Sequence, residues 1–269
     1  MRAVPELEVR HADVAGYPLA YAVQGSGAAV VLIHGSLCDL RYWKAQVAAL
    51  GAAFRVFSVS LRHHWPERWD GHGGDFSIAR HTADIAGFIE QVVGEPAHVV
   101  GHSRGARVAF DLARGWPELA RSVTLADPGL PPAGLDDGRD DFRQRALQAI
   151  EAGDVERGLA LFIDTVSGAD TWRRMVPWFK EMVLDNANTL FGQARELRLP
   201  VTAEQVHTLT KPVLLIGGAL SPAPYPAILD YLQQWLPHAM RVTIAGSSHG
   251  MNLGNPRAFN TALRQFFQH

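Results

Sequence analysis

The stretch AHVVGHSRGA, residues 97–106, decides how the rest of this sequence is interpreted. An apolar run of strand character leads into the pattern Gly-x-Ser-x-Gly, formed by Gly101, Ser103 and Gly105, and a helical pattern follows at once. A serine between a strand and a helix needs a strained backbone, and glycines two positions away on either side avoid a steric collision. The strain lifts the serine hydroxyl clear of the sheet. The stretch therefore predicts that Ser103 is a nucleophile presented at a sharp turn.

Strand-like apolar runs recur on both sides of this stretch and alternate with helical patterns over 78–93, 105–119 and 256–269. Continuous apolar runs of this length are typical of strands that are buried on both faces, as in parallel sheets. The alternation predicts an α/β fold with a mostly parallel, eight-stranded sheet flanked by helices, which opens in an antiparallel hairpin. Besides 97–101, the runs expected to form strands are 7–10, 19–23, 29–33, 55–59, 122–126, 212–217 and 241–246.

Residues 129–207 interrupt this alternation, because they contain helix-like segments and no convincing strand. The region begins with a stretch rich in Pro, Gly and Asp, PGLPPAGLDDGRDD (128–141), which indicates a hinge or loop. We expect a helical cap over 129–207, inserted after the sixth strand, and an α/β core domain formed by 1–128 and 208–269. Bulky cap side chains should mostly pack against the core, with a minority lining a substrate pocket: Phe162, Trp172, Met175, Trp178, Phe179, Met182 and Phe191.

The composition excludes several classes of protein. The 269 residues are 47% hydrophobic and 19% charged, with a formal net charge of -2, which fits a globular protein with a sizeable core. No basic run suggests nucleic acid, and no apolar run is long enough to span a membrane. Cys38 is the only cysteine, so no internal disulfide can form, and the N-terminus lacks the apolar core of a signal peptide. We therefore expect a cytoplasmic protein without nucleic-acid or membrane partners.

Of the twelve histidines, His249 is the one placed to act as a base. It follows the last predicted strand and precedes the closing helix, which puts it at the carboxyl edge of the sheet, the same edge as Ser103. A serine hydroxyl is a poor nucleophile until a base takes its proton. The alternative is a turn histidine that caps a helix. Other histidines match no zinc spacing, and no metal is expected even where they gather near carboxylates: His63, His72 and His81, with Asp70 and Asp75.

Four motifs together resemble the α/β-hydrolase superfamily, in particular its capped branch of serine esterases, lactonases and carbon–carbon bond hydrolases. They are His34-Gly35 after the third predicted strand, LRHHWP (61–66) where that family often has D-x-R-G-H-G, the GHSRG turn at 101–105, and His249. The resemblance covers nearly the whole chain, and its motifs are specific for the fold but much less so for the substrate.

The resemblance also implies roles for residues around the nucleophile. It implies an oxyanion hole formed by the backbone N–H groups of Ser36, which follows His-Gly, and of Arg104, which follows Ser103. It further implies that Arg62 and His64 organise the loop after the fourth strand. His34 is open to either a structural or a functional role.

The acid that should orient the histidine departs from the family pattern. Most members of the superfamily carry it after the seventh strand, but here that segment reads LLIGGALSPAPYPAIL (214–229), with Ser221 near the expected position. No Asp or Glu follows before Asp230, which the helical pattern places in a buried position. Asp127 comes directly after the sixth strand, and the superfamily includes members that draw their acid from this strand end. We therefore expect Asp127 to orient His249; the alternative is an aspartate that caps a turn.

The predicted function is cofactor-free hydrolysis of a carboxylic ester or lactone. Ser103 attacks the carbonyl carbon, His249 transfers the proton, Asp127 orients His249, and water then releases the acyl group. The expected substrate is a small apolar or aromatic ester-like molecule. Two alternatives stay open: hydrolysis of a carbon–carbon bond by the same three residues, and a small-molecule sensor with vestigial hydrolysis. No oligomeric state follows from the sequence.

Overall fold

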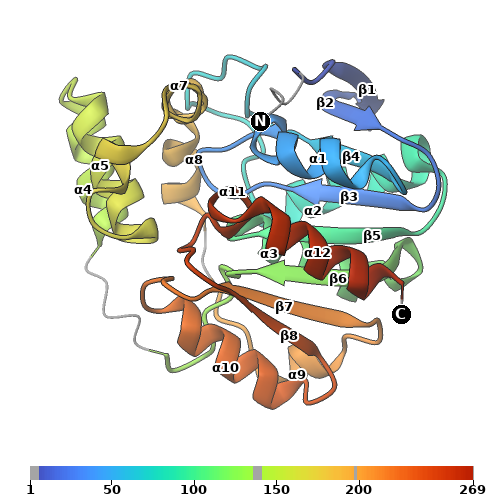
Figure 1. The fold of residues 1–269 in the computed structure, drawn as a ribbon. Coiled ribbons are helices and arrows are strands. Elements are labelled where there is room, and N and C mark those ends of the chain that lie inside the picture. The colour runs from blue at the N-terminus through green and yellow to red at the C-terminus, as the bar shows by residue number, and fades with distance from the viewer. Residues whose placement is uncertain (1–5, 136–140, 197–198, 269) are drawn as a thin grey trace.

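One sheet of eight strands organises the computed structural model, which describes residues 6–135, 141–196 and 199–268. From edge to edge the order is β1-β2-β4-β3-β5-β6-β7-β8 (Figure 1). β2 pairs antiparallel with β1 and β4, and the other neighbours pair parallel. The predicted α/β fold with its mostly parallel sheet and opening hairpin is confirmed. The strands are β1 (Arg10–Val14), β2 (Tyr17–Gln24), β3 (Ala29–Ile33), β4 (Arg55–Val59), β5 (Ala97–His102), β6 (Ala120–Ala126), β7 (Val213–Gly218) and β8 (Met240–Ile244).

The first strand begins later than the sequence predicts. The apolar pattern at 7–10 predicts a strand there, but β1 covers Arg10–Val14. Ala15 and Gly16 form the turn into β2, with φ of 51° and 80°. β1 lies at the edge of the sheet and most of its side chains are exposed, so its sequence carries little apolar signal. The geometry of the turn, rather than hydropathy, determines where this strand lies.

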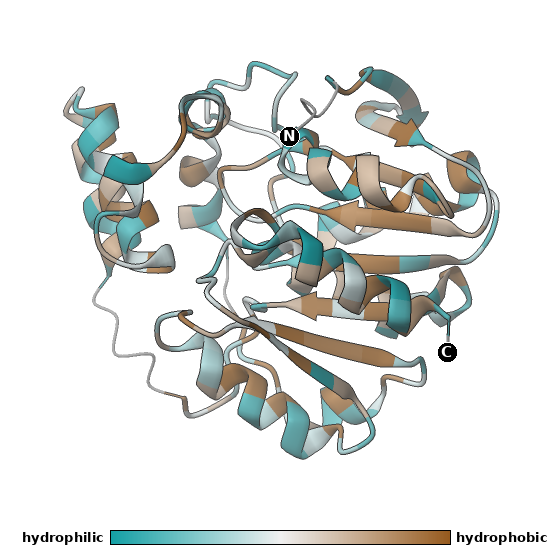
Figure 2. Ribbon diagram, in the orientation of Figure 1, coloured by the Kyte–Doolittle hydropathy of each residue, from teal (hydrophilic) through white to brown (hydrophobic). Residues whose placement is uncertain are grey.

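Each inner strand contributes to two apolar cores, one on each face of the sheet. In β3, Val31 and Ile33 pack on the face that is covered by α2 (Ile78–Phe88), α3 (Arg104–Gly115) and α10 (Tyr225–Trp235). Because side chains alternate along a strand, the neighbouring residues of β3 pack on the opposite face. That face is covered by helices α1 (Lys44–Leu50) and α12 (Pro256–Phe267). Figure 2 shows the hydrophobic strands between helices that turn hydrophilic residues outward.

The predicted helices are present, and two of them are followed by a short turn of another helical type. Residues 78–93 form α2 followed by a π-helical turn, and 105–119 form α3 followed by a 3-10 turn. Every helix in the described parts of the chain is too short or too polar to cross a bilayer. The short elements are η1 (Leu40–Trp43), η2 (Ile89–Val93), η3 (Pro117–Leu119) and α11 (Met251–Gly254).

A helical insertion follows β6, as the sequence predicts, and no strand occurs in the part of 129–207 that the structure describes. We refer to residues 142–196 as the cap; in Figure 1 it stands beyond the carboxyl ends of the strands. The cap has its own apolar core, which Leu37 of the sheet domain joins. The insertion contains α4 (Phe142–Glu151), α5 (Val155–Ser167), α6 (Thr171–Arg174), α7 (Pro177–Asp185), α8 (Thr189–Arg195) and α9 (Ala203–His207).

The boundaries at 129 and 207 stay a prediction. Val206 of α9 packs in the apolar core under α2 and α3, and Val201 lies in the same core. The last part of the insertion therefore packs with the sheet domain rather than with α4–α8.

Candidate active site

A sharp turn joins β5 to α3 and carries Ser103. Its backbone lies at φ 53° and ψ -117°, a conformation that side chains other than glycine rarely adopt. A Cβ at Gly101 would lie 2.3 Å from the carbonyl oxygen of Gly105, and a Cβ at Gly105 would lie 2.3 Å from that of His34. Close packing of the turn against its own helix and against the end of β3 thus requires both glycines of the GHSRG pattern.

The loop after β3 lies directly against this turn. A Cβ at Gly35 would lie 3.1 Å from the Cβ of Ser103, so a larger residue here would push the two segments apart by a few tenths of an ångström. The next residue of the loop, Ser36, and the first residue of α3, Arg104, line the same cavity as Ser103. In the described parts of the chain, no backbone carbonyl accepts a hydrogen bond from the N–H of Ser36 or Arg104. Both N–H groups are therefore available to an external acceptor.

His34 fixes the position of this loop. Its Nδ1 donates to the carbonyl of Gly35 at 2.8 Å, and its Nε2 accepts from the N–H of Leu61 at 3.0 Å, beyond the end of β4. Burial lowers the pKa of His34 to about 3, so the ring is neutral and can accept at Nε2. Of the two roles left open for His34, the contacts indicate the structural one.

Asp127 contacts His249 from behind the cavity, which His249 lines. Asp127 follows β6 with φ 36° and is fully buried, and the Nδ1 of His249 donates to its Oδ2 at 3.2 Å. The hydroxyl of Ser221 donates to the same oxygen at 2.5 Å. Burial raises the pKa of Asp127 to about 7, although the hydrogen bond from Ser221 acts to lower it. Ser221, which stands near the place where the superfamily usually carries the acid, therefore donates to the carboxylate that the neighbouring strand supplies.

Two aromatic residues that the sequence did not single out hold the ring and backbone of His249. The ring of Tyr225 stacks on it with centroids 4.0 Å apart and planes 15° apart. His102, the variable position before the nucleophile, donates from Nε2 to the carbonyl of His249 at 2.8 Å. Burial lowers the pKa of His102 to about 3, which keeps it neutral. Tyr225 carries no motif, whereas a polar residue beside the nucleophile is a signal that could have pointed to His102.

The residues assigned to loop structure make buried contacts with one another. Arg62 donates to both carboxylate oxygens of Asp84 at 2.8 Å, and His64 donates to the carbonyls of Leu61 and Arg62. His63 stacks on Trp69 with centroids 4.6 Å apart. These contacts hold the loop after β4 against α2.

Asp230 corrects one expectation from the helical pattern. It is exposed rather than buried, because it lies on the outer side of α10, where it pairs with Arg241 at 2.7 Å. It therefore does not compete with Asp127 for His249.

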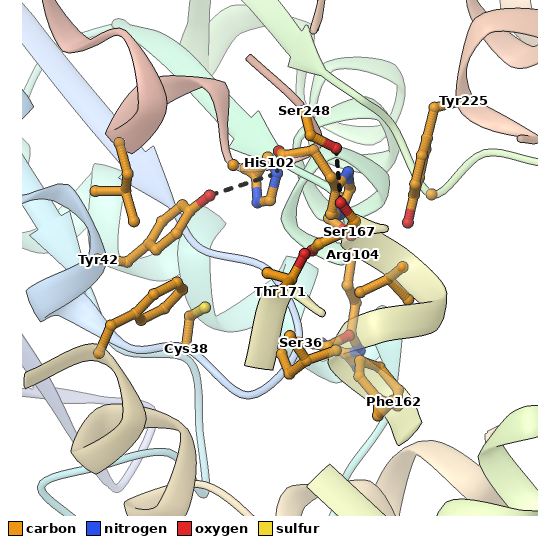
Figure 3. A pocket seen from close by; sticks show the side chains of 18 of the residues that line it. Ser36, Cys38, Tyr42, His102, Arg104, Phe162, Ser167, Thr171, Tyr225 and Ser248 are labelled. Atoms are coloured by element: carbon orange, nitrogen blue, oxygen red, sulfur yellow. Dashed lines mark hydrogen bonds between the residues drawn. The ribbon is translucent and has the colours of Figure 1, made fainter. Parts of the chain in front are cut away.

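The cavity that Ser103 and His249 share has a volume of about 1260 Å³ and lies between the sheet domain and the cap. Figure 3 shows residues of the sheet domain, such as Ser36 and Tyr225, facing cap residues such as Phe162 and Ser167. Most of the wall is apolar. The apolar cap residues that line it are Phe162, Ile163, Val166, Met175, Val176, Trp178 and Phe179.

A mostly parallel sheet with a strained serine after its fifth strand and a helical insertion after its sixth defines the α/β class of hydrolases. The chain belongs to the Alpha/beta hydrolase family, whose sequence pattern matches residues 30–262.

Relatives along the whole chain are distant and are named as hydrolases. The chain is 26% identical to 2-(acetamidomethylene)succinate hydrolase of Mesorhizobium japonicum, an alignment covering 96% of this chain and 94% of that protein. It is 27% identical to the pimeloyl-[acyl-carrier protein] methyl ester esterase of Photobacterium profundum, with coverage of 93% and 98%. The crystal structure of the enol-lactonase from Burkholderia xenovorans LB400 superposes with a TM-score of 0.81 at 22% identity, covering 96% of this chain and all of that one. The family and these names support a hydrolase, and the superposition shows the shared fold.

Other curated relatives match over a part only. The chain is 36% identical over 124 residues to the dihydrolipoyllysine-residue acetyltransferase component of the acetoin cleaving system of Cupriavidus necator. That alignment covers 44% of this chain and 31% of the relative. This chain thus matches about a third of the relative's length.

Proposed function

We propose that the protein hydrolyses a carboxylic ester or lactone through an acyl-enzyme on Ser103, without a cofactor. The observation that supports this most is the 3.2 Å contact between Nδ1 of His249 and Oδ2 of the buried Asp127. A carboxylate in this place fixes the tautomer of the imidazole, so that the lone pair of the ring lies on Nε2, the nitrogen that takes the proton. It also stabilises the imidazolium that forms when the proton is transferred.

The reaction proceeds in two halves. Nε2 of His249 takes the proton of Ser103 as Oγ bonds to the carbonyl carbon, and the same nitrogen returns the proton to the leaving alkoxide as the acyl C–O bond breaks. In the second half, His249 takes a proton from water as the water oxygen bonds to the acyl carbon, and Nε2 returns that proton to Oγ of Ser103 as the acyl C–O bond to Ser103 breaks. In both halves the negative charge forms on the carbonyl oxygen, where the N–H groups of Ser36 and Arg104 stabilise it.

The cavity supports a small apolar or aromatic ester-like substrate. Aromatic and aliphatic side chains from the cap form most of the wall opposite Ser103, which favours an apolar acyl or alcohol group. Among the relatives, one is named for a methyl ester and one structural neighbour for an enol-lactone, and both names agree with attack at an acyl carbon.

The engaged carboxylate favours an enzyme over a sensor with vestigial hydrolysis. A decayed site would not need to keep Asp127 fully buried in contact with His249, with a second hydrogen bond from Ser221. Hydrolysis of a carbon–carbon bond uses the same three residues and is the outcome to which a failure of ester turnover would point.

Turnover of p-nitrophenyl esters of graded acyl length, together with chromogenic lactones, tests the proposal. The wild type should release a burst of one p-nitrophenolate per protein before steady turnover, and Ser103→Ala should lose about 10⁴-fold or more in kcat. Ser26→Ala, at an exposed serine in the β2–β3 turn, is the matched control and should be unchanged. A wild type that is inactive on every ester and lactone would overturn the proposed reaction.

A further inference from the structure

The end of α8 contacts both residues whose backbone N–H groups form the proposed oxyanion hole. The hydroxyl of Ser36 donates to Oε1 of Gln193 at 2.8 Å. The guanidinium of Arg104 forms an ion pair with Glu196, with Nε to Oε2 at 3.3 Å and a second, shorter contact from Nη2 to Oε1. Gln193 and Glu196 lie three positions apart at the base of the cap.

These contacts are shielded from water. Gln193 is 3% exposed, and the side chains of Arg104 and Glu196 are each 8% exposed. An ion pair in such surroundings is screened little, and the loss of one partner leaves an uncompensated buried charge. The two contacts should therefore fix the side chains of Ser36 and Arg104 firmly.

The sheet domain holds Arg104 from the other side. Nη1 of Arg104 donates to Nδ1 of His81 at 2.9 Å, and His81 in turn donates from Nε2 to the carbonyl of Arg62 at 3.2 Å. Burial keeps the pKa of His81 well below its usual value, so the ring is neutral and can accept this hydrogen bond. Glu196 thus supplies the contact of the Arg104 side chain that comes from the cap.

We propose that Gln193 and Glu196 are positioning residues that orient Ser36 and Arg104, so that the oxyanion hole is complete only when the cap is seated. This inference rests on the proposed function. Donors stabilise an oxyanion only when they are aimed at the position that the oxyanion will occupy, and small displacements reduce the effect sharply. The cap therefore contributes to the chemical step as well as to the walls of the cavity.

Steady-state kinetics of Gln193→Ala and Glu196→Gln on the best p-nitrophenyl ester test the inference. Each should lower kcat about tenfold or more while KM changes less than about twofold, because the lost interaction acts in the transition state. The affinity for a trifluoromethyl ketone, which adds to Ser103 to give a tetrahedral oxyanion, should fall in proportion. The affinity for the matching secondary alcohol, which forms no oxyanion, should not.

A control variant separates this effect from general loosening of the cap. Asp185 of α7 forms another ion pair between the cap and the sheet domain, with Arg41 at 2.8 Å, and neither residue touches Ser36 or Arg104. Asp185→Asn should leave kcat within about twofold, as expected for a partly exposed pair. An equal fall of kcat in Asp185→Asn and Glu196→Gln would overturn the inference.

The route through Ser36 is tested by a double variant. Ser36→Ala keeps the backbone N–H but removes the contact with Gln193, so Ser36→Ala/Gln193→Ala should be no slower than the slower single variant. Additive losses, or a change in KM alone, would contradict a positioning role. This cycle also carries the test if Glu196→Gln does not fold. Ser103→Ala is measured in parallel. If Ser103→Ala retains turnover, the proposed function itself is refuted. If Ser103→Ala loses turnover but the Gln193 and Glu196 variants keep a normal kcat, only the positioning role is refuted.

Discussion

The carboxyl ends of β6 and β7 lie side by side, and the proposed acid follows β6 here, whereas most of the superfamily carries it after the seventh strand. β6 is followed at once by Asp127, which is fully buried, and β7 is followed three residues later by Ser221, which is half-buried. The hydroxyl oxygen of Ser221 lies 2.5 Å from Oδ2 of Asp127 and donates a hydrogen bond to it. The comparison teaches that two neighbouring parallel strands deliver side chains to one small volume, so the acid can come from either.

Glycines at the end of β7 bring that strand close to the side chains of Asp127 and Ser221. A Cβ at Gly217 would lie 3.3 Å from Oδ1 of Asp127, and a Cβ at Gly218 would lie 2.7 Å from Oγ of Ser221. Gly217 thus leaves room for the carboxylate that arrives from the adjacent strand, and Gly218 leaves room for the hydroxyl of Ser221 that donates to it. Residues of both strand ends therefore surround the Asp127 carboxylate.

The largest expected effect is the difference in kcat between a variant at the end of β6 and a variant at the end of β7. Asp127→Asn keeps the shape of the side chain but offers Nδ1 of His249 the wrong partner, and kcat should fall about 10⁴-fold. Ser221→Ala removes only a supporting hydrogen bond, and kcat should fall about tenfold at most. Both are measured on the same ester as Ser103→Ala. If the two variants lose activity equally, the acid does not reside on β6 alone.

A transplant of the acid between the strand ends should recover part of the lost activity. Asp127→Ala/Ser221→Asp puts a carboxylate at the place from which Ser221 now reaches the oxygen that contacts His249. We expect the double variant to be about 10- to 100-fold faster than Asp127→Ala, as judged by kcat/KM. Ser221→Asp in the wild-type background is the control and should be slower than wild type, because two carboxylates then face each other. A double variant no faster than Asp127→Ala would show that the β7 end cannot reach the histidine.

The pH dependence of kcat/KM tests the contact between Asp127 and Ser221, and the expected change is smaller than those above. Asp127 has a raised pKa of about 7 and must be ionised to accept from His249, so kcat/KM should fall as the pH drops below about 7. The hydroxyl of Ser221 lowers that pKa, so its removal in Ser221→Ala should raise the pKa further and move the acidic limb to higher pH. Measuring kcat/KM at a series of pH values for the wild type and for Ser221→Ala gives the acidic limb of each protein. A limb that moves to lower pH would contradict the assigned hydrogen bond.

The smallest effect concerns the backbone. Asp127 has φ 36°, in the region that favours glycine, whereas the backbone of Ser221 does not lie there. Asp127→Gly and Asp127→Ala both lack the carboxylate, so the glycine variant should be more stable by about 1 kcal/mol through relief of strain. At Ser221 the order should reverse, because glycine there only adds freedom to the unfolded chain. Urea denaturation of the four variants measures the difference.

Most of the fold could be predicted because its signals are local. Continuous apolar runs and the GHSRG turn indicate the inner strands and the nucleophile, and the absence of an acid after the seventh strand directs attention to Asp127. The first strand was misplaced, since an edge strand exposes most of its residues and carries little pattern.

The contacts of the cap could not be predicted. Ser36 and Gln193 are 157 positions apart, and Arg104 and Glu196 are 92 apart, so the pairs form only through the way in which the cap sits on the sheet. The stacking of Tyr225 on His249 is likewise a tertiary result without a motif.

The buried histidines link the stability of this protein to proton uptake. Burial holds the pKa of His34 and His102 at about 3 and that of His98 at about 4, and those of His64 and His81 lie well below the usual value. In the unfolded chain these rings bind protons below about pH 6.5, whereas in the folded protein they do not.

Stability is therefore greatest above about pH 6.5 and is lost as the pH falls toward the folded pKa values, by up to about 1.4 kcal/mol per pH unit for each ring. Asp127, with its raised pKa, opposes this trend with a single proton. Thermal unfolding between pH 7.5 and 5 should show the melting temperature dropping steeply, with net uptake of protons on unfolding. The buried rings that help to hold the loops around the cavity thus also make the fold sensitive to acid.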